Sequence, residues 1–542
     1  MKPLIPLSGL DGAFLHLETP ATPMHVASLH LFELPAPGSA ARRGKPFDFH
    51  AAITRLMRGR LHLAPVFERK LAPMPLGFAN PVWVHDDAVD LGWHIRRVTL
   101  PAPGGRAELE AMAAALHAEP LDRSRPLWRI FVFDGLAGEL AGLGGYCIQV
   151  HHAVLDGQAG VLLAQALFDL TPVPRKVAPR GRPLKAEHPG LATLATAALK
   201  HDAGQYIKFV RHLPDVLRTL RGLAGGLVGG RVGDGMPALG RSLRFGPHTA
   251  LNVPITAERG FAGVSLPLDA LKRLAAAHDA KLNDIVLALA AGTLRRWLAR
   301  HGGIPKKPLV AAMPISLRAA GNTEYTTQAT MSLVSLHTHL ADPVKRLQAI
   351  RDGAGAVKAL AARAKGVLPT DFPSIALPWL LHGLATAYGK TGLAGALPPI
   401  ANVIVSNVPG PTAPLYAAGA RMVTYWPLSI PEHGVALNLT VMSYAGALGF
   451  GFTVARCAVP EARELADALV ASYDELVART PTASGAAARD DRASAVRGEK
   501  RGKRWPPAPV RVPAPAPRPA PAPARAEARA RARKAAPRAP VR

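Results

Sequence analysis

The sequence predicts an α/β protein in which a pattern of strands and helices occurs twice. Short apolar runs bounded by Gly, Pro and Asn alternate with stretches that have the spacing of amphipathic helices. The pattern first extends to about residue 170 and restarts near Ala250, after a segment rich in Pro, Lys and Arg. With 542 residues and 49% hydrophobic content, the chain has room for two or three domains with sizeable cores.

Strands and helices alternate in the first half of the chain. Pro126 fixes the entry into one strand, and a Gly-containing turn predicts a hairpin between this strand and the next. Asp11 is a candidate cap for a short helix. We expect strands at residues 23–32, 81–87, 94–98, 127–133 and 146–150, and helices within residues 48–70, 107–118 and 161–170.

The second half contains a similar series. Asn283 or Asp284 is a natural cap for a long apolar helix, and residues 406–411 form a stiff, Pro-rich turn after a buried strand. Two strands are expected to form a hairpin across residues 445–447. We expect strands at residues 266–268, 309–317, 401–405, 437–444 and 448–453, and helices at 269–279, 285–298, 342–365 and 460–478.

The stretch His151-His152-Ala153-Val154-Leu155-Asp156-Gly157 follows the predicted strand at 146–150. An imidazole has an unperturbed pKa of roughly 6.5, so a neutral histidine at a strand end can accept a proton from a hydroxyl group. Asp156 is expected to fix the turn and Gly157 to permit it. Adjacent side chains on a strand point to opposite faces, so only one histidine can enter a given site. Metal binding and a purely structural histidine pair are the alternatives.

The chain is strongly basic, with a formal net charge of +27. Residues 481–542, rich in Pro, Ala and Arg, supply +12 of it and are expected to be disordered; they either bind polyanions weakly or have no dedicated partner. Residues 171–190 have the composition of a linker. Within 191–232 a basic amphipathic pattern indicates a helix that binds a membrane surface or a partner, or packs on its own protein.

Two cysteines, Cys147 and Cys457, lie within apolar stretches, which predicts a reduced, cytoplasmic protein without a disulfide framework. We recognise no signal peptide and no apolar run of about 18 residues that would span a bilayer. A soluble or peripheral protein is therefore expected.

Taken together, these stretches resemble the bacterial wax ester synthase/acyl-CoA:diacylglycerol acyltransferase family. The similarity covers roughly residues 7–480, except for much of 171–240. The stretch that begins at His151 is shared with peptide-synthetase condensation domains, so the order of all the motifs carries the resemblance. The matching residues are Pro23-Met24-His25-Val26, Pro126-Leu127-Trp128, His151 to Gly157, Asn283-Asp284, Ser406-Asn407-Val408-Pro409-Gly410-Pro411 and Ser443-Tyr444.

The resemblance implies two lobes of the chloramphenicol-acetyltransferase kind with a central tunnel. The lobes would comprise residues 1–170 and 246–480, joined by a connection at 171–245 and followed by the tail at 481–542. In this family the second histidine, here His152, acts as the general base.

His152 would deprotonate the hydroxyl of a diacylglycerol or a long-chain alcohol, which attacks the thioester of acyl-CoA without an acyl-enzyme. Acyl-CoA is then a substrate, and no cofactor or metal is expected. His151 would position the loop, and Asp156 would pair with an arginine, for which Arg69 is a candidate. Asn283 and Asp284 would face the cavity, and Trp128, with Pro126 and Leu127, would shape its wall. The resemblance also implies a cytoplasmic protein associated peripherally with the inner membrane or lipid droplets.

Three stretches depart from the family pattern. Arg129 stands where an acidic residue is usual, residues 323–327 are unlike the family's run, and Arg456-Cys457 replaces an acidic turn. These departures affect the expected substrate preference more than the chemistry. Two other functions stay open: a condensation domain fed by carrier proteins, and a non-catalytic protein that associates with lipid droplets or nucleic acid.

Overall fold

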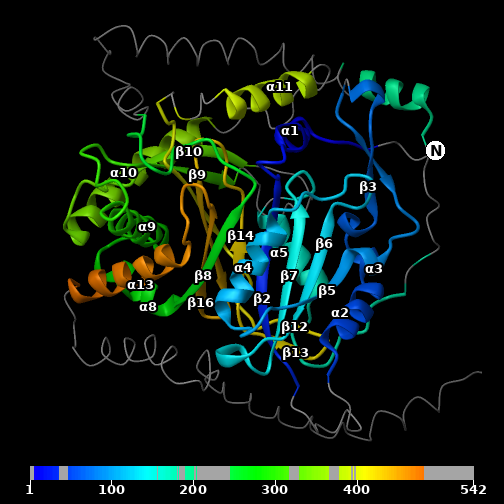
Figure 1. Cartoon of the computed structure of the whole chain (residues 1–542), viewed down its shortest axis with the longest axis horizontal. Helices are drawn as coiled ribbons and strands as arrows, with labels where there is room; N and C mark the ends of the chain where they lie inside the picture. The colour runs from blue at the N-terminus through cyan, green and yellow to red at the C-terminus, as the bar shows by residue number, and fades with distance from the viewer. Residues whose placement is uncertain are drawn as a thin grey trace, which may run out of the picture. The chain divides into compact units, whose positions relative to one another are not determined.

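Two large β-sheets form the frame of the part of the chain that the structure describes (Figure 1). The computed structural model describes residues 5–35, 47–77, 79–155, 157–179, 181, 189–200, 203, 245–316, 329–364, 377–391, 395 and 398–480. Both sheets combine parallel and antiparallel neighbours and carry helices, so the fold is mixed α/β, as the sequence predicts.

The first sheet has the strand order β12-β13-β2-β7-β6-β5, and β14 also pairs with β2. Its strands are β2 (His25–Glu33), β5 (Ile95–Thr99), β6 (Trp128–Asp134), β7 (Leu143–His151), β12 (Tyr416–Ala417), β13 (Ala420–Met422) and β14 (Trp426–Leu428). The predicted hairpin of β6 and β7 is confirmed. Strands β12, β13 and β14 come from the second half of the chain, and two of them pair directly with β2 of the first half.

The second sheet has the order β10-β9-β11-β15-β16-β8. Its strands are β8 (Arg259–Pro267), β9 (Val310–Ser316), β10 (Ala329–Ser335), β11 (Val403–Val408), β15 (Leu437–Tyr444) and β16 (Ala447–Ala455). The predicted hairpin is confirmed, since β15 and β16 pair antiparallel across Ala445 and Gly446.

One face of the second sheet is covered by helices α8 (Leu268–Ala277), α9 (Leu282–Leu298), α10 (Pro343–Ala364) and α13 (Arg463–Ala478). Helix α9 is apolar on all sides and largely buried, as expected for a helix that other elements surround. Val403 and Val405 of β11 pack into this helical core, while Ser406 and Val408 end on the opposite face. The alternation of a strand therefore separates a core face from a second, partly polar face.

The first sheet carries α2 (Phe49–Arg58) and α5 (Gly157–Leu167) on one face and α4 (Arg106–His117) on the other. Helix α4 also contacts β8 of the second sheet (Figure 1). There, the Arg463 guanidinium pairs with the Glu110 carboxylate, which also accepts the Gly263 N–H at 3.0 Å. Buried contacts thus join the two sheets on the α4 side.

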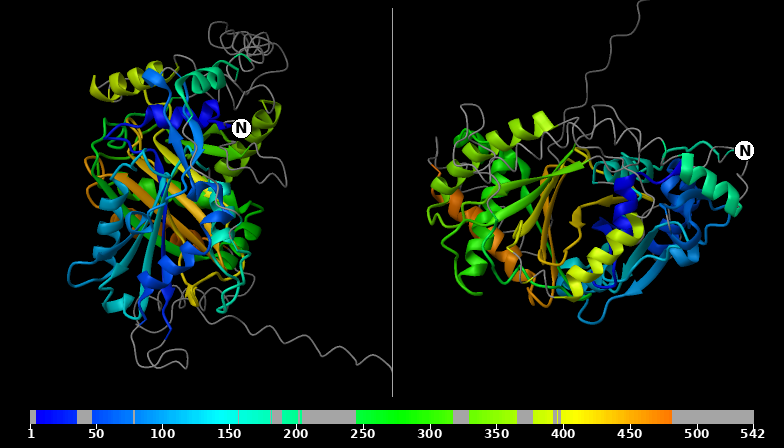
Figure 2. Two further views of the ribbon diagram at one scale, coloured as in Figure 1. Left: turned by 90° about the vertical axis from the view of Figure 1, so that its right-hand side faces the viewer. Right: turned by 90° about the horizontal axis from the view of Figure 1, so that it is seen from above.

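Smaller elements complete the described fold, and Figure 2 gives two further views of them. Strands β1 (Ile5–Pro6), β3 (Arg69–Ala72) and β4 (Val82–His85) form a third sheet. Helical residues 191–200 pack Leu194 and Ala198 against it. The remaining helices are α1 (Gly9–Leu17), α3 (Leu91–His94) and α11 (Leu377–Lys390), with short 3-10 turns at 61–63, 65–67, 75–77 and 138–140. Among the described residues, no helix is both long and apolar enough to cross a bilayer.

Several predicted boundaries are wrong. The strand predicted at 266–268 is the end of the much longer β8 (Arg259–Pro267), which pairs along its whole length with β16. Helix α9 begins at Leu282 with Lys281 as its N-cap, because the Asp284 carboxylate reaches back to the Lys281 N–H at 2.8 Å. Helix α1 is capped by Ser8, whose hydroxyl accepts the Asp11 N–H at 3.1 Å. Strand β11 continues to Val408, because it pairs with β15 beyond the predicted end.

Several predictions fall outside the described residues. They concern Asp156, most of the basic segment 191–232, the unusual run at 323–327 and the tail at 481–542.

Candidate active site

A cavity lies between the two large sheets, and the empty space within it and at its opening to solvent is about 820 Å³. The first sheet and its helix contribute residues of β2, β7, β14 and α5 to the wall, and the second sheet contributes residues of β11 and β15. Most wall residues are apolar, as in binding sites for apolar ligands. The polar residues in the wall are Ser28, His30, His152, Ser406, Tyr425, Ser429 and Thr440. Such a wall suits a ligand with a long aliphatic part and few polar groups.

His152 follows β7 and lines the cavity. Its backbone N–H donates to the Met24 carbonyl at 2.9 Å, and its ring stacks on Phe14 with centroids 4.0 Å apart. Ile148 and Val150, on the same face of β7, also line the cavity. The imidazole is therefore held at the end of a rigid strand beside an apolar space.

His151 lies on the opposite side of the strand end and is fully buried. Its Nδ1 accepts the Ala153 N–H at 3.1 Å, so its proton is on Nε2, which donates to the Glu18 carboxylate at 3.2 Å. Burial lowers the pKa of His151, and the Glu18 carboxylate opposes this shift. The ring is thus fixed in one tautomer and turned away from the cavity.

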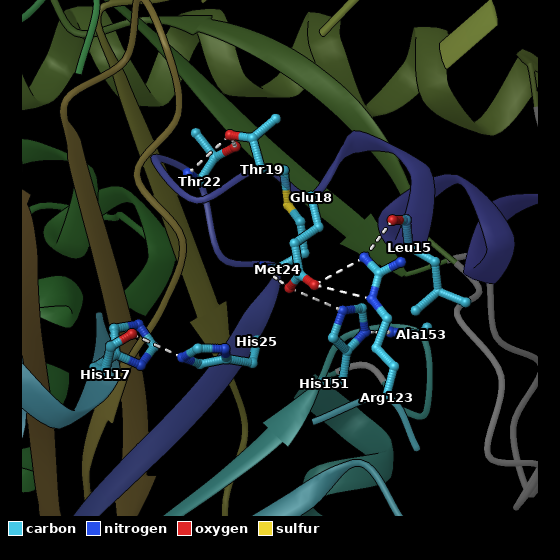
Figure 3. A network of polar contacts seen from close by, with 10 residues as sticks. All are labelled: Leu15, Glu18, Thr19, Thr22, Met24, His25, His117, Arg123, His151 and Ala153. Carbon is cyan, nitrogen blue, oxygen red and sulfur yellow. Dashed lines mark hydrogen bonds and ion pairs between the residues drawn. The ribbon is translucent and has the colours of Figure 1, made fainter. Parts of the chain in front are cut away.

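Glu18 is the centre of a polar network around this strand end (Figure 3). It also accepts the Met24 N–H at 2.9 Å and pairs with the Arg123 guanidinium at 2.8 Å. Although burial raises its pKa, the hydrogen bond from His151, the nearby Arg123 guanidinium and the Met24 N–H lower it to about 2. Since the Met24 carbonyl holds the His152 backbone, Glu18 positions both histidines.

A second pair of histidines lies beside this network (Figure 3). His25 Nε2 donates to the His117 carbonyl at 2.7 Å, and His117 Nε2 donates to the Ser429 carbonyl at 2.9 Å. Burial lowers the pKa of His25 to about 4 and that of His117 well below its usual value. Both rings are neutral near pH 7 and tie β2 and α4 to the segment that follows β14.

Pro126, Leu127 and Trp128 are buried but are not among the residues that line the cavity. The Leu127 carbonyl accepts the His151 N–H at 3.0 Å. The Trp128 indole donates to the Phe67 carbonyl at 3.3 Å and stacks on His94 with centroids 4.1 Å apart. The structure thus places this motif in the core that supports the end of β7.

Asn283 and Asp284 are not among the cavity-lining residues either. The Asn283 amide oxygen accepts from Asn407 Nδ2 at 3.3 Å, and the Asp284 carboxylate caps α9. Asn407 lies between Ser406 and Val408, whose side chains line the cavity, so it points to the other face of β11. The structure thus brings Asn283 and Asn407 together on the α9 side of the sheet.

The remaining predicted features have mixed outcomes. Gly157 begins α5, and the proposed pairing of Asp156 with Arg69 is not described. Arg129 pairs with Glu119 at 3.2 Å, so it finds an acidic partner.

Cys147 is buried, which raises its pKa to about 12, but Cys457 is exposed rather than part of a core. No cluster of candidate metal ligands occurs within the residues that the structure describes.

Sequence reasoning missed Glu18, its contact with Arg123 and the polar groups Ser28, His30 and Tyr425 of the cavity wall. Glu18 is the only acidic residue between Asp11 and Glu33, which is a weak signal in an apolar stretch. Its role depends on residues more than 100 positions away, which a local pattern does not reveal.

Comparisons with known structures first define the class of protein. The fold resembles that of the first condensation domain of the calcium-dependent antibiotic synthetase, with a TM-score of 0.51 and 15% identity over 89% of this chain and 98% of that domain. At this identity the likeness concerns the fold alone. The chain therefore has the two-lobed α/β architecture of the chloramphenicol-acetyltransferase kind.

Family comparisons are more specific. The wax ester synthase/diacylglycerol acyltransferase catalytic domain matches residues 7–286, and the C-terminal domain of the same family matches residues 327–477. The chain belongs to this family of acyltransferases.

Individual relatives agree with this assignment. The chain is 36% identical to "Putative diacyglycerol O-acyltransferase Rv3740c" of Mycobacterium tuberculosis, over 87% of this chain and 99% of that protein. It is 34% identical to "Putative diacyglycerol O-acyltransferase Rv1760" of the same organism, over 87% and 90%. The wax ester synthase/diacylglycerol acyltransferase from Marinobacter aquaeolei VT8 has a similar structure, with a TM-score of 0.62 and 28% identity over 88% of this chain and 99% of that one.

Proposed function

We propose that this protein transfers a fatty acyl group from acyl-CoA to the hydroxyl of diacylglycerol, and also to long-chain alcohols. One observation carries the proposal: of the two histidines in the motif, His152 lines an apolar cavity and His151 points into the Glu18 network. The mycobacterial relatives are named for diacylglycerol acylation and the Marinobacter enzyme for both reactions, so diacylglycerol is the first acceptor to test.

The proposed mechanism uses His152 as a general base. Its imidazole removes the proton of the acceptor hydroxyl while the oxygen attacks the thioester carbon. The carbon–sulfur bond then breaks, and the sulfur leaves as CoA thiol with the proton that His152 had accepted. No acyl-enzyme forms, and no metal or cofactor takes part. An apolar wall favours this route because it limits water, which would otherwise hydrolyse the thioester.

Purified protein with labelled palmitoyl-CoA and either diolein or hexadecanol tests the proposal. We expect triacylglycerol or wax ester, and a rate at least about 100-fold lower for His152→Ala, the usual loss when a general base is removed. His339→Ala is a matched control, because His339 is exposed and outside the cavity wall. Transfer from carrier-bound acyl groups but not from acyl-CoA would instead indicate a condensation domain.

We further propose that the protein is cytoplasmic and docks peripherally on the inner membrane or on lipid droplets. Leu191 and Leu199 are 70% and 58% exposed on the helical stretch 191–200, and Leu76, in the loop before β4, is 91% exposed. Exposed leucines on neighbouring elements suit insertion into a lipid surface. Flotation with vesicles should weaken in Leu191→Ser/Leu199→Ser. Truncation after residue 480 would reveal any contribution of the basic tail to binding polyanions.

A further inference from the structure

The hydroxyl groups of the cavity wall lie at different depths below His152. Strand β14 ends one residue before Ser429, and its pairing with β2 places Ser429 level with Val26, which pairs with Val150. Val150 is two residues before His152. Since a strand rises about 3.3 Å per residue, Ser429 and His152 are separated by roughly 7 Å along the strands.

The other wall hydroxyls lie deeper. By the same pairing of β2 with β7, Ser28 is level with a residue four positions before the candidate base, roughly 13 Å away along the strands. Ser406 and Thr440 pair with each other at this depth, because β16 packs there on the part of β14 that pairs with Ser28. Tyr425, which precedes β14, is deeper still. Ser429 therefore carries the wall hydroxyl nearest to the candidate base.

This nearest hydroxyl is also free to donate. The Ser28 hydroxyl lies 2.7 Å from His30 Nε2, within hydrogen-bond distance. The Thr440 hydroxyl donates to Asn438 Oδ1 at 2.9 Å. No residue that the structure describes forms a hydrogen bond with the Ser429 hydroxyl, although Ser429 is half-buried and lines the cavity. A ligand can therefore accept its proton without breaking a bond within the protein.

The backbone of Ser429 is held from both sheets. Its N–H donates to Thr453 Oγ1 on β16 at 3.0 Å, and its carbonyl accepts from His117 Nε2 at 2.9 Å. His117 is the last residue of α4, and its own carbonyl accepts from His25 of β2 at 2.7 Å. The position of the Ser429 backbone is thus fixed before a ligand binds, as electrostatic stabilisation of a transition state requires.

During acyl transfer, the thioester oxygen gains negative charge as the acceptor oxygen adds to the thioester carbon. This charge is costly in an apolar cavity unless a hydrogen-bond donor faces it. We propose that the Ser429 hydroxyl donates a hydrogen bond to this oxygen, and that His117 is the positioning residue that holds Ser429. The inference rests on the proposed function. Ser429 keeps its proton throughout, and the bonds that form and break are those of the transfer itself.

Steady-state transfer from palmitoyl-CoA to diolein by the full-length protein tests the donor. Ser429→Ala should lower kcat about 100-fold and leave the KM for palmitoyl-CoA within about twofold, because the hydrogen bond strengthens only as charge develops. Ser332→Ala is the matched control and should keep the kcat of the unsubstituted protein. Ser332 is half-buried on β10 and outside the cavity wall. An unchanged kcat in Ser429→Ala would overturn the proposal.

Ser406 provides a direct comparison. Its hydroxyl also lines the cavity and makes no hydrogen bond with the residues that the structure describes, but it lies roughly 7 Å deeper than that of Ser429. Ser406→Ala should therefore lower kcat much less than Ser429→Ala does. A larger fall of kcat in Ser406→Ala would assign the donor to Ser406 and contradict the assignment to Ser429.

A double-mutant cycle tests the positioning role of His117. His117→Ala should lower kcat about 10-fold in the unsubstituted protein and have no further effect in Ser429→Ala, because it acts through the hydroxyl that Ser429→Ala lacks. The same loss in both backgrounds would mean that His117 supports the fold rather than Ser429.

A binding measurement separates failure of the donor from failure of the proposed function. The probe is a fluoroketone analogue of palmitoyl-CoA, whose hydrate places a tetrahedral carbon where the thioester carbon lies. Ser429→Ala should bind this analogue at least about 5-fold more weakly than the unsubstituted protein does, with equal affinity for palmitoyl-CoA. Equal affinity for the analogue would overturn the donor. If the unsubstituted protein shows this preference but transfers no acyl group, the donor stands and the proposed function fails.

Discussion

The two sides of the β7 end differ sharply, although each receives a histidine from the same dipeptide. On one side His151 is enclosed by Glu18, Arg123 and the backbone of Ala153, which fix its tautomer. On the other side His152 borders an apolar cavity and stacks on Phe14. Both residues are histidines, so the residue type does not distinguish them. The face of the strand on which each side chain lies makes His151 a positioning residue and His152 the candidate base.

The largest expected effect comes from replacing Glu18, whose carboxylate lies on the His151 side of the β7 end. Glu18→Ala leaves the buried His151 N–H without an acceptor and frees the Met24 backbone, so we expect a loss of about 2–4 kcal/mol in unfolding free energy. Urea denaturation measures this change. Glu18→Gln, which keeps the shape and one acceptor oxygen, is the control and should lose less. Equal stability of Glu18→Ala and the unsubstituted protein would contradict the positioning role.

Low pH should lower the unfolding free energy, because it favours protonation of the buried, neutral histidines near the Glu18 network. Burial lowers the pKa of His25 from 6.5 to about 4, so the unfolded chain binds this proton more readily than the folded one. Stability should therefore fall as the pH drops from 6.5 toward 4, by on the order of 3 kcal/mol for this residue. Unfolding free energies measured across this range should fall less steeply for His25→Asn. The same slope for both proteins would argue against a neutral, buried His25.

A smaller effect is expected where β14, on the cavity side, approaches the second sheet. A Cβ atom at Gly451 of β16 would collide with the Pro427 carbonyl. Gly451→Ala should therefore displace β14, which lines the cavity, and cost about 1–3 kcal/mol. Thermal unfolding should show the loss of stability, and a transfer assay should show the effect of the displaced β14 on activity. The control is Gly181→Ala, which should be neutral because a Cβ atom at Gly181 would meet no atom within 4 Å. Gly446 is not suitable as a control, because its φ of 88° would strain an alanine.

The smallest effect is expected at the exposed end of the Glu18 network. The Arg123 side chain is 43% exposed, so water screens its ion pair with Glu18. Arg123→Gln should change the unfolding free energy by no more than about 1 kcal/mol, and less in high salt. A loss as large as that of Glu18→Ala, measured by the same urea titration, would mean that Arg123 rather than His151 is the main partner of Glu18.

The sequence allowed the separation of the two histidines to be predicted, because alternation along a strand is a local rule. It also allowed the strands β6, β7, β15 and β16 and most helices to be predicted, since their apolar patterns are long enough to read. Glu18 could not be recognised, because its partner His151 is 133 positions away and meets it only once β2 pairs with β7.

Strands β12, β13 and β14 are another case that a local pattern does not reveal. They contain only two or three residues each, too few for a periodicity, and they cross from the second half of the chain to β2. Tyr425, which lies just before β14, therefore entered no sequence-based site. Trp128 was predicted to shape the cavity wall but is buried in the core. The sequence could not distinguish the two places, because a large aromatic side chain fits a core as well as a cavity.

Single-turnover transfer from acyl-CoA to diacylglycerol, compared between His152→Asn and the unsubstituted protein, tests the central claim most directly. If His152 is the base, the rate of the transfer step falls at least about 100-fold while the affinity for acyl-CoA is unchanged. A transfer rate in His152→Asn equal to that of the unsubstituted protein would contradict the account.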